Sequence, residues 1–374
     1  MVNIRTSRSW IEVDLDAITH NLDELSSLLN KNSSLMVVVK AEGYGHGLVE
    51  VAKHCQKMGI EAFAVATIDE GIKLREHGIY GEILVLGYSH PIRAIELHNY
   101  RLIQTIVNRE HARQLNESGH MINVHIKIDT GMHRFDLSDY ESIKEIYDYQ
   151  FIHIQGYFTH LCVCDSKRKV DQEYTQKQIA AFYDLINELK LRHYDIGKVH
   201  LQSSYGLVNY PEINADYARV GILMYGVYST FNDYSKVQLD LKPALTIKAQ
   251  IAMLHYLTKG ASLGYGLTYK VNRDSVIAVI PIGYGDGLPR ILSSNGSVLI
   301  KGQKCPIVGR ICMDQMLVDV SEISDISDND LVTVIGQDGT EEIRVEEIAL
   351  EANTISNEIL SRLGSRLPRI YRGG

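Results

Sequence analysis

A chain of 374 residues is long enough for a barrel of about 250 residues and a second domain. Hydrophobic residues make up 45% and charged residues 22% of it, which is the composition of a globular protein rather than a disordered one. The formal net charge of -8 at pH 7 argues against nucleic acid as a partner, because phosphate binding requires a clustered basic face.

The five cysteines show neither a disulfide framework nor the spacing of a zinc site, which indicates a reducing compartment. No secretory signal precedes the first predicted strand, and no apolar run approaches the roughly 20 residues of a membrane span. We therefore expect a cytoplasmic protein with no membrane segment in this chain.

The first two-thirds of the chain alternates short apolar segments with amphipathic ones. The apolar segments are rich in Val and Ile, as expected for strands that are buried on both faces. Eight strand–helix units fit a TIM-type (β/α)8 barrel that opens with the strand at 11–15, although a doubly wound sheet has the same periodicity. The predicted strands span 11–15, 35–40, 62–66, 83–86, 102–107, 124–128, 154–159 and 199–202, and the helices 16–29, 48–58, 69–76, 109–117 and 172–189.

The pattern changes between about 225 and 240. From Ala244 onward the strands alternate or end in turn signals such as Asn295-Gly296, which is typical of antiparallel sheets. We predict a barrel domain at 1–235 and a mainly antiparallel β domain at 236–374. The predicted strands of this β domain span 246–254, 275–281, 298–300, 316–320 and 331–335, and its predicted helices lie only at 345–352 and 355–363.

Lys40 gives the clearest chemical signal, because it ends an apolar strand and precedes a turn that contains Gly43, Gly45 and Gly47. Active sites of barrel enzymes lie at the carboxyl ends of the strands. Burial there lowers the pKa of a lysine, and its neutral amine can form a Schiff base. A surface lysine whose charge reaches the solvent is the plainer interpretation.

Several segments, in the same order along the chain, resemble motifs of the alanine racemase family. The resemblance implies a homodimeric racemase that uses pyridoxal 5'-phosphate (PLP), acts on a small amino acid and has a barrel followed by a β domain. The segments are 10–15, 37–47, 127–134, 216–222, 264–266 and 309–315.

The resemblance implies which residues bind PLP. Lys40 would hold the cofactor covalently through its amine. Tyr44, Ser204 and the backbone N–H groups of Gly221 and Ile222 would bind its phosphate, as glycine turns and helix starts do. The segment around Ser204 is no G-x-S-x-G elbow, which disfavours a hydrolase nucleophile there.

The resemblance also implies the proton-transfer residues. Arg219 would face the pyridine nitrogen, and because arginine only donates, that nitrogen stays unprotonated and transamination is suppressed. Racemisation needs a base on each face of the α-carbon, and these would be Lys40 and Tyr265. His160 would hydrogen-bond to Tyr265 and link it to Arg219. An arginine in a salt bridge and a structural tyrosine or histidine are the alternatives.

Lys127 would be carbamylated and would orient Arg134 toward the phenolic oxygen of PLP; an unmodified Lys127 paired with Asp129 is the alternative. The residues that match Tyr265 and Met313 reach the active site of the partner subunit in this family. A homodimer with shared active sites is therefore expected.

Asn357 stands where the family usually has a tyrosine beside the substrate. The smaller amide opens volume near the substrate β-carbon and supplies both a donor and an acceptor, which predicts that serine is accepted besides alanine. The segment 200–210 resembles the catalytic domains of vancomycin-resistance serine racemases, in which a membrane domain precedes the racemase. The chain is then either a cytoplasmic enzyme or the cytoplasmic part of a membrane-anchored protein.

Three other functions fit parts of the sequence. An ordinary alanine racemase shares every catalytic residue. A barrel-type PLP decarboxylase also has a β domain but lacks a base of the Tyr265 kind, and a non-catalytic PLP carrier resembles the barrel alone. A metal enzyme is disfavoured, because the histidines lack ligand spacing.

Overall fold

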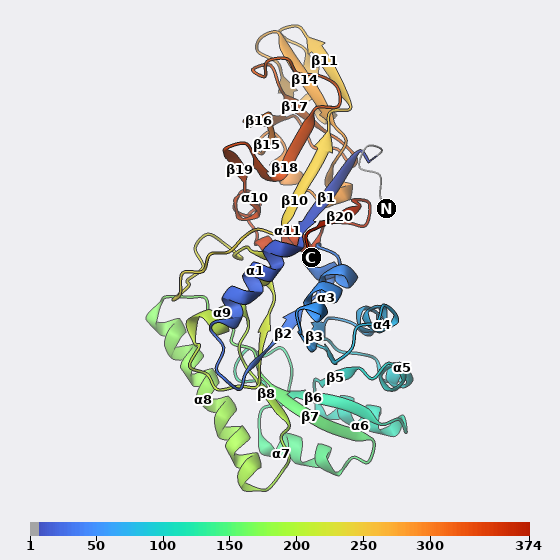
Figure 1. The fold of residues 1–374 in the computed structure, drawn as a ribbon, viewed down its shortest axis with the longest axis vertical. Coiled ribbons are helices and arrows are strands. Elements are labelled where there is room, and N and C mark those ends of the chain that lie inside the picture. Colours follow the sequence, from blue (N-terminus) through green and yellow to red (C-terminus); the bar gives the residue numbers. More distant parts are fainter. Residues whose placement is uncertain (1–6) are drawn as a thin grey trace.

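The computed structural model describes residues 7–374, so the first six residues of the predicted barrel domain lie outside its range. Parallel strands form its first part: β2 (Ser34–Val38), β3 (Ala62–Val65), β4 (Glu82–Val85), β5 (Ile103–Ile106), β6 (Ile122–Lys127), β7 (Ile152–Phe158), β8 (Lys198–His200) and β9 (Tyr217–Val220). They pair in the order β8-β7-β6-β5-β4-β3-β2-β9, which Figure 1 shows in the lower part of the molecule. Backbone hydrogen bonds from Asp216 to Val199 (2.8 Å) and from Arg219 to Gln202 (3.0 Å) join the two ends. The predicted (β/α)8 barrel is confirmed, since a doubly wound sheet does not close in this way.

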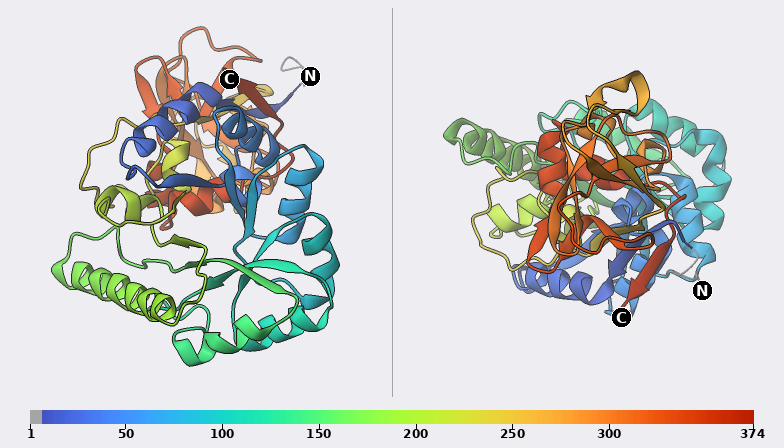
Figure 2. Two further views of the ribbon diagram at one scale, coloured as in Figure 1. Left: turned by 60° about the horizontal axis from the view of Figure 1, so that its bottom comes forward. Right: turned by 90° about the horizontal axis from the view of Figure 1, so that it is seen from above.

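Helices cover the outside of the barrel (Figure 2). Several of them begin at a polar side chain that accepts a hydrogen bond from the first turn, for example Asp14 from the Ala17 N–H (3.0 Å) and Asn108 from the His111 N–H (2.7 Å). All five predicted helices are found. The helices of this part are α1 (Leu15–Ser26), α2 (Lys40–Tyr44), α3 (Leu48–Lys57), α4 (Ile68–Glu76), η2 (Pro91–Arg93), α5 (Ala94–Asn99), α6 (Arg109–Glu117), α7 (Tyr140–Ile143), η3 (Lys144–Asp148), α8 (Lys169–Leu191), α9 (Ser204–Asn209) and η4 (Ile222–Tyr225).

The prediction that the strand at 11–15 opens the barrel is wrong. This strand, β1 (Ser9–Asp14), pairs antiparallel with β10 (Leu245–Gln250) and parallel with β20 (Arg369–Arg372), so it belongs to the sheet of the C-terminal domain. The eighth barrel strand is β9 instead. In β1 the apolar residues Ile11 and Val13 alternate with Glu12 and Asp14, whereas a barrel strand such as β3 is apolar throughout, so this alternation favours the antiparallel sheet.

The second sheet lies at one end of the barrel (Figure 1), and its strands pair in the order β11-β14-β17-β16-β15-β18-β10-β1-β20, with β19 added to β18. Every pairing except β1 with β20 is antiparallel, which confirms the predicted mainly antiparallel domain. The strands not yet named are β11 (Met253–Leu257), β14 (Ser275–Ile280), β15 (Ser297–Ile300), β16 (Gln303–Val308), β17 (Met316–Asp319), β18 (Leu331–Asp338), β19 (Glu341–Ile343) and the separate pair β12 (Ser262–Leu263) and β13 (Tyr269–Lys270). The helical segments are η5 (Tyr265–Leu267), η6 (Tyr284–Asp286), η7 (Arg290–Leu292), α10 (Val345–Glu351) and α11 (Ser356–Ser361).

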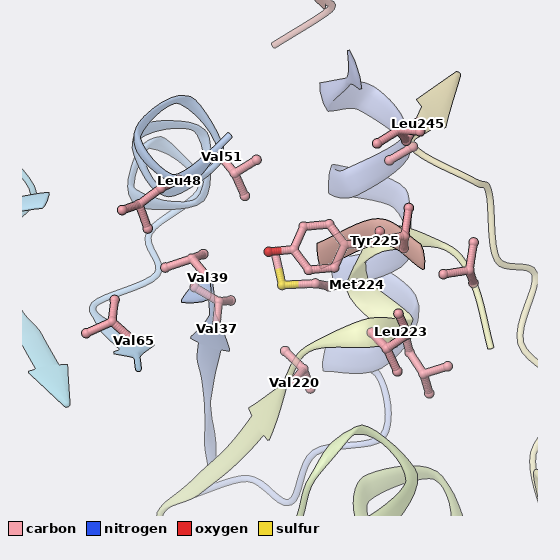
Figure 3. Packing of buried hydrophobic residues seen from close by; sticks show 14 of the residues in the cluster. Val37, Val39, Leu48, Val51, Val65, Val220, Leu223, Met224, Tyr225 and Leu245 are labelled. Atoms are coloured by element: carbon pink, nitrogen blue, oxygen red, sulfur yellow. The ribbon is translucent and has the colours of Figure 1, made fainter. Parts of the chain in front are cut away.

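Apolar packing fixes the end of β2 from which Lys40 projects (Figure 3). Tyr225 lies fully buried beside Val37 of β2 and Leu48 of α3, and its hydroxyl donates to the Val38 carbonyl oxygen (3.2 Å). Burying each such apolar side chain stabilises the fold by about 1.5–3 kcal/mol. Among residues 7–374 no helix has both the length and the apolar character that crossing a membrane requires.

Candidate active site

A cavity of about 490 Å³ opens at the carboxyl ends of the barrel strands. Active sites of this fold lie at that face. Ten of the twelve site residues predicted from the sequence line the cavity, and Tyr265 and Met313 do not. The ten are Lys40, Tyr44, Lys127, Arg134, His160, Ser204, Arg219, Gly221, Ile222 and Asn357.

Lys40 enters the cavity from a left-handed turn that follows β2. Ala41, Glu42 and Tyr44 have φ between 51° and 54°, a conformation that costs about 1–2 kcal/mol for each residue other than glycine. The carboxylate of Glu70 holds the turn, since it accepts from the Ala41 N–H at 2.7 Å. Burial lowers the pKa of Lys40, and the nearby cation Arg134 lowers it further, which favours the neutral amine.

Arg219 is held in one orientation by acceptors on neighbouring strands. Its Nη1 donates to His200 Nδ1 (2.8 Å), and its Nη2 donates to the carbonyl oxygens of Thr159 (2.7 Å) and Leu201 (3.1 Å). Within the described residues, Nε–H donates to no acceptor, although Arg219 lines the cavity. The Nε–H donor of Arg219 is therefore available to a ligand.

His160 lies beside Arg219, with its Nδ1 at 3.5 Å from Nη2 of the arginine. Burial, together with the positive charge of Arg219, lowers the pKa of His160 to about 3. The imidazole is therefore neutral, so one of its ring nitrogens donates a hydrogen bond and the other accepts one. Its predicted partner Tyr265 lies on the other domain, so that contact is not made within the chain.

Lys127 and Arg134 both line the cavity, and neither forms an ion pair with a carboxylate among residues 7–374. The Nζ atom of Lys127 lies 4.4 Å from the centre of the Phe135 ring. Asp129 does not pair with Lys127, because its carboxylate binds the N–H groups of Gly131 (2.9 Å) and His133 (3.0 Å). The alternative of a Lys127–Asp129 pair is thus wrong.

Four cations face the cavity: Lys40, Lys127, Arg134 and Arg219. None of them forms an ion pair with a carboxylate in the part of the chain that the structure describes. Uncompensated positive charge at a buried site is unfavourable, so a bound anion would be stabilised there. The cavity is suited to a ligand that carries phosphate or carboxylate groups.

The predicted phosphate site lies at one end of the cavity. Ser204 Oγ accepts from the Gly221 N–H (2.8 Å), so that N–H is already engaged by the serine. A Cβ atom at Gly221 would lie 3.0 Å from the Tyr44 hydroxyl, which shows how closely the two segments approach. Burial raises the pKa of Tyr44 to about 12, so its hydroxyl remains a donor.

Tyr265 and Met313 lie on the C-terminal domain and are 69% and 52% exposed. Leu267 and Tyr284 are exposed on the same domain. Large apolar side chains gathered on one domain are typical of a surface that contacts another protein.

Asn357 lies on α11 and lines the cavity. Its Oδ1 atom is buried and has no hydrogen-bond partner in the described part of the chain. A buried acceptor without a donor is unfavourable, so a ligand hydroxyl that donates to it would be favoured.

Sequence reasoning missed several residues of the site. Glu70 holds the Lys40 turn, His200 binds Arg219, and Tyr205 lines the cavity near Asn357. Glu70 and His200 contact residues far away in the sequence, so no local spacing indicates their roles.

Lys127 offers a pH test of these charges. Burial and the neighbouring Arg134 lower its pKa to about 8, below the roughly 10.4 of a lysine in an unfolded chain. The unfolded state therefore binds more protons between these values, and stability rises with pH across the window. The measurement compares the melting temperatures of the wild type and Lys127→Met in buffer free of carbon dioxide. As the pH rises from about 8 to 10, we expect the melting temperature of the wild type to rise by a few degrees relative to that of the variant. A constant difference between the two proteins would contradict the lowered pKa.

Comparison with known families identifies the class of protein. Residues 13–229 match the family described as "Alanine racemase, N-terminal domain" and residues 244–371 match "Alanine racemase, C-terminal domain". A barrel and a β domain in this order, with a lysine-lined cavity at the barrel mouth, define an amino-acid racemase fold. The chain belongs to the alanine racemase family.

Individual relatives support the same assignment. An amino-acid racemase of Enterococcus faecalis is 43% identical over 370 residues, which cover 98% of this chain and 52% of the relative. A serine/alanine racemase of Enterococcus gallinarum is 40% identical over 362 residues, which cover 96% of this chain and 51% of the relative. The chain thus spans about half the length of these relatives. The solved alanine racemase of Clostridium difficile 630 superimposes with a TM-score of 0.92 at 35% identity and covers 98% of this chain and 96% of its own.

Proposed function

We propose that this chain is a PLP-dependent racemase that interconverts the L and D forms of serine as well as of alanine. Asn357 carries the serine part of the proposal, because the residue lines the cavity that receives the substrate and its buried Oδ1 lacks a donor. The serine/alanine racemase of Enterococcus gallinarum is a relative at 40% identity. We further propose that the D-amino acid enters cell-wall precursors, including those of vancomycin resistance.

The residues of the cavity fit PLP. The cations of the cavity and the hydroxyls of Tyr44 and Ser204 suit its phosphate, the free Nε–H of Arg219 suits its ring nitrogen, and the amine of Lys40 suits its aldehyde. When bound, PLP withdraws electrons from the α-carbon of the amino acid and weakens its C–H bond. Because the Nε–H of Arg219 only donates, it keeps the ring nitrogen unprotonated and limits transamination.

Two bases then exchange protons with the α-carbon. Lys40, whose pKa is lowered by burial, accepts or returns a proton at Nζ on one face. Tyr265 of the partner subunit serves the other face through its hydroxyl oxygen. His160 is neutral, and its Nδ1 lies 3.5 Å from Arg219 Nη2, which only donates, so its Nε2–H donates to the hydroxyl oxygen of that tyrosine and orients the phenol toward the α-carbon.

A homodimer completes the site in this proposal. Tyr265 and Met313 are exposed on their own chain and absent from its cavity, as expected for side chains that enter a second copy. The C-terminal domain of one subunit would then close the barrel mouth of the other and exclude water from the reaction.

Two substitutions of Asn357 test the substrate assignment. Asn357→Leu keeps the branched skeleton but removes the acceptor, and a buried serine hydroxyl without a partner costs about 1–3 kcal/mol. We expect kcat/KM for L-serine to fall about tenfold to a hundredfold relative to L-alanine. Asn357→Tyr removes the amide acceptor as well and also reduces the volume of the cavity, so it is expected to disfavour serine at least as strongly as Asn357→Leu.

The measurement is racemase activity on both amino acids, coupled to D-amino-acid oxidase. Asn357→Gln retains an amide and is the control for a change at this position alone. If the serine-to-alanine ratio stays constant in the Leu and Tyr variants, Asn357 does not select the substrate. Activity on alanine alone in the unmodified protein would leave an ordinary alanine racemase.

A further inference from the structure

His125 is a buried residue of β6 for which the proposed reaction has no use. It lies inside the barrel without exposed surface. Its Nδ1 atom lies 2.9 Å from Nε2 of His200, and its own Nε2 has no partner among residues 7–374. A buried polar atom without a partner lowers stability, so its presence requires an explanation.

The direction of the hydrogen bonds in this region follows from Arg219. A guanidinium only donates, so His200 Nδ1 must accept from Arg219 Nη1 at 2.8 Å. Burial and the charge of Arg219 lower the pKa of His200 far below its ordinary value and that of His125 to about 3, so both rings are neutral. A neutral imidazole has one N–H, so His200 carries its proton on Nε2 and donates it to His125 Nδ1.

The surrounding strands keep the two rings in place. Phe158 stacks on His200 with ring centres 4.9 Å apart and planes at 4°. A Cβ atom at position 156 would lie 2.9 Å from His125 Nε2, so only Gly156 leaves room for the ring. His125 therefore has one hydrogen-bonding role in this arrangement, which is to accept from His200.

We propose that His125 is a positioning residue that acts on the cofactor through His200 and Arg219. By accepting from His200 Nε2–H, it holds the His200 ring in the orientation in which Nδ1 accepts from Arg219. The guanidinium is thereby held with its Nε–H available to a ligand. The inference rests on the proposed function in one respect, since it takes the ligand of that N–H to be the ring nitrogen of PLP.

Two variants of equal shape separate the hydrogen bond from packing. Asn and Leu have the same branched skeleton, and Oδ1 of an asparagine at 125 would occupy the place of the imidazole Nδ1. His125→Asn retains the acceptor, whereas His125→Leu removes it. The melting temperatures of both variants show whether either one is misfolded.

The first readout is the hydrogen bond of the His200 Nε2–H, observed by proton–nitrogen NMR in histidine-labelled protein and assigned with His200→Asn. We expect a downfield-shifted Nε2 proton that exchanges slowly with solvent in the wild type and in His125→Asn, with and without PLP. We expect this proton to lose its downfield shift and to exchange faster in His125→Leu. The same shift and exchange rate in all three proteins would overturn the proposal.

The second readout is the ratio of keto acid to racemised product in the PLP-loaded enzyme. Loss of one hydrogen bond is expected to raise this ratio about fivefold in His125→Leu, with the wild-type ratio restored in His125→Asn. An unchanged ratio in a Leu variant that has lost the His200 Nε2–H hydrogen bond would overturn the link to the cofactor. Absence of racemase activity in the wild type would refute the proposed function, while the NMR result would still decide the role of His125 toward Arg219.

Discussion

Lys40→Ala and Tyr265→Phe are each expected to lower racemase activity about a thousandfold, because each removes the proton acceptor on one face of the α-carbon. Mixed dimers of the two variants are expected to regain about half of the wild-type activity. Lys40 lines the cavity of its own chain, whereas Tyr265 is exposed on its own chain and does not. In a mixed dimer, one of the two sites therefore combines an intact lysine with an intact tyrosine.

The experiment uses two differently tagged chains that are expressed together, and mixed dimers that are isolated through both tags. Tyr256→Phe is the matched control, because Tyr256 is also an exposed tyrosine of the C-terminal domain but has no assigned role. It is expected to keep full activity alone. Mixed dimers that stay inactive would show that Tyr265 serves its own chain. Full activity of Tyr265→Phe alone would show that Tyr265 takes no part in catalysis.

The sequence predicts the barrel because parallel strands buried on both faces leave a strong pattern of Val and Ile runs. It misplaces β1 because this strand comes first along the chain and a helix follows it, although Glu12 and Asp14 alternate with its apolar residues. The strand that closes the barrel, β9, is short and follows polar residues, so periodicity alone does not reveal it.

The candidate site is predicted where the chemistry is local to a segment. Lys40 and Tyr44 belong to one turn, and a strand that ends in a lysine already points to the barrel mouth. The contacts between Arg219, His200 and His125 depend on which strands become neighbours when the barrel closes. For Asp129, closeness in sequence is misleading. It lies two residues from Lys127, which suggests an ion pair, but its carboxylate binds the turn at Gly131 instead.

The charges of the cavity connect the cofactor to the fold. Its cations repel one another, and no ion pair within residues 7–374 compensates the four at the barrel mouth. Binding of an anionic cofactor is therefore expected to stabilise the protein as well as to activate it. Arg219 differs from the other three in the number of its fixed contacts, which makes it the residue whose loss should change the chemistry most.

Arg219→Gln is expected to lower kcat/KM by about a hundredfold to a thousandfold, which is the usual effect of removing one preorganised donor. The ratio of keto acid to racemised product is expected to rise as well, because the ring nitrogen can then bind a proton from water or a neighbouring group. Arg75→Gln is the matched control, since Arg75 also holds carbonyl oxygens, among them those of Tyr100 (2.9 Å) and Ile79 (2.9 Å), outside the cavity. If both variants lost activity equally and in proportion to their loss of stability, Arg219 would serve the barrel rather than the cofactor.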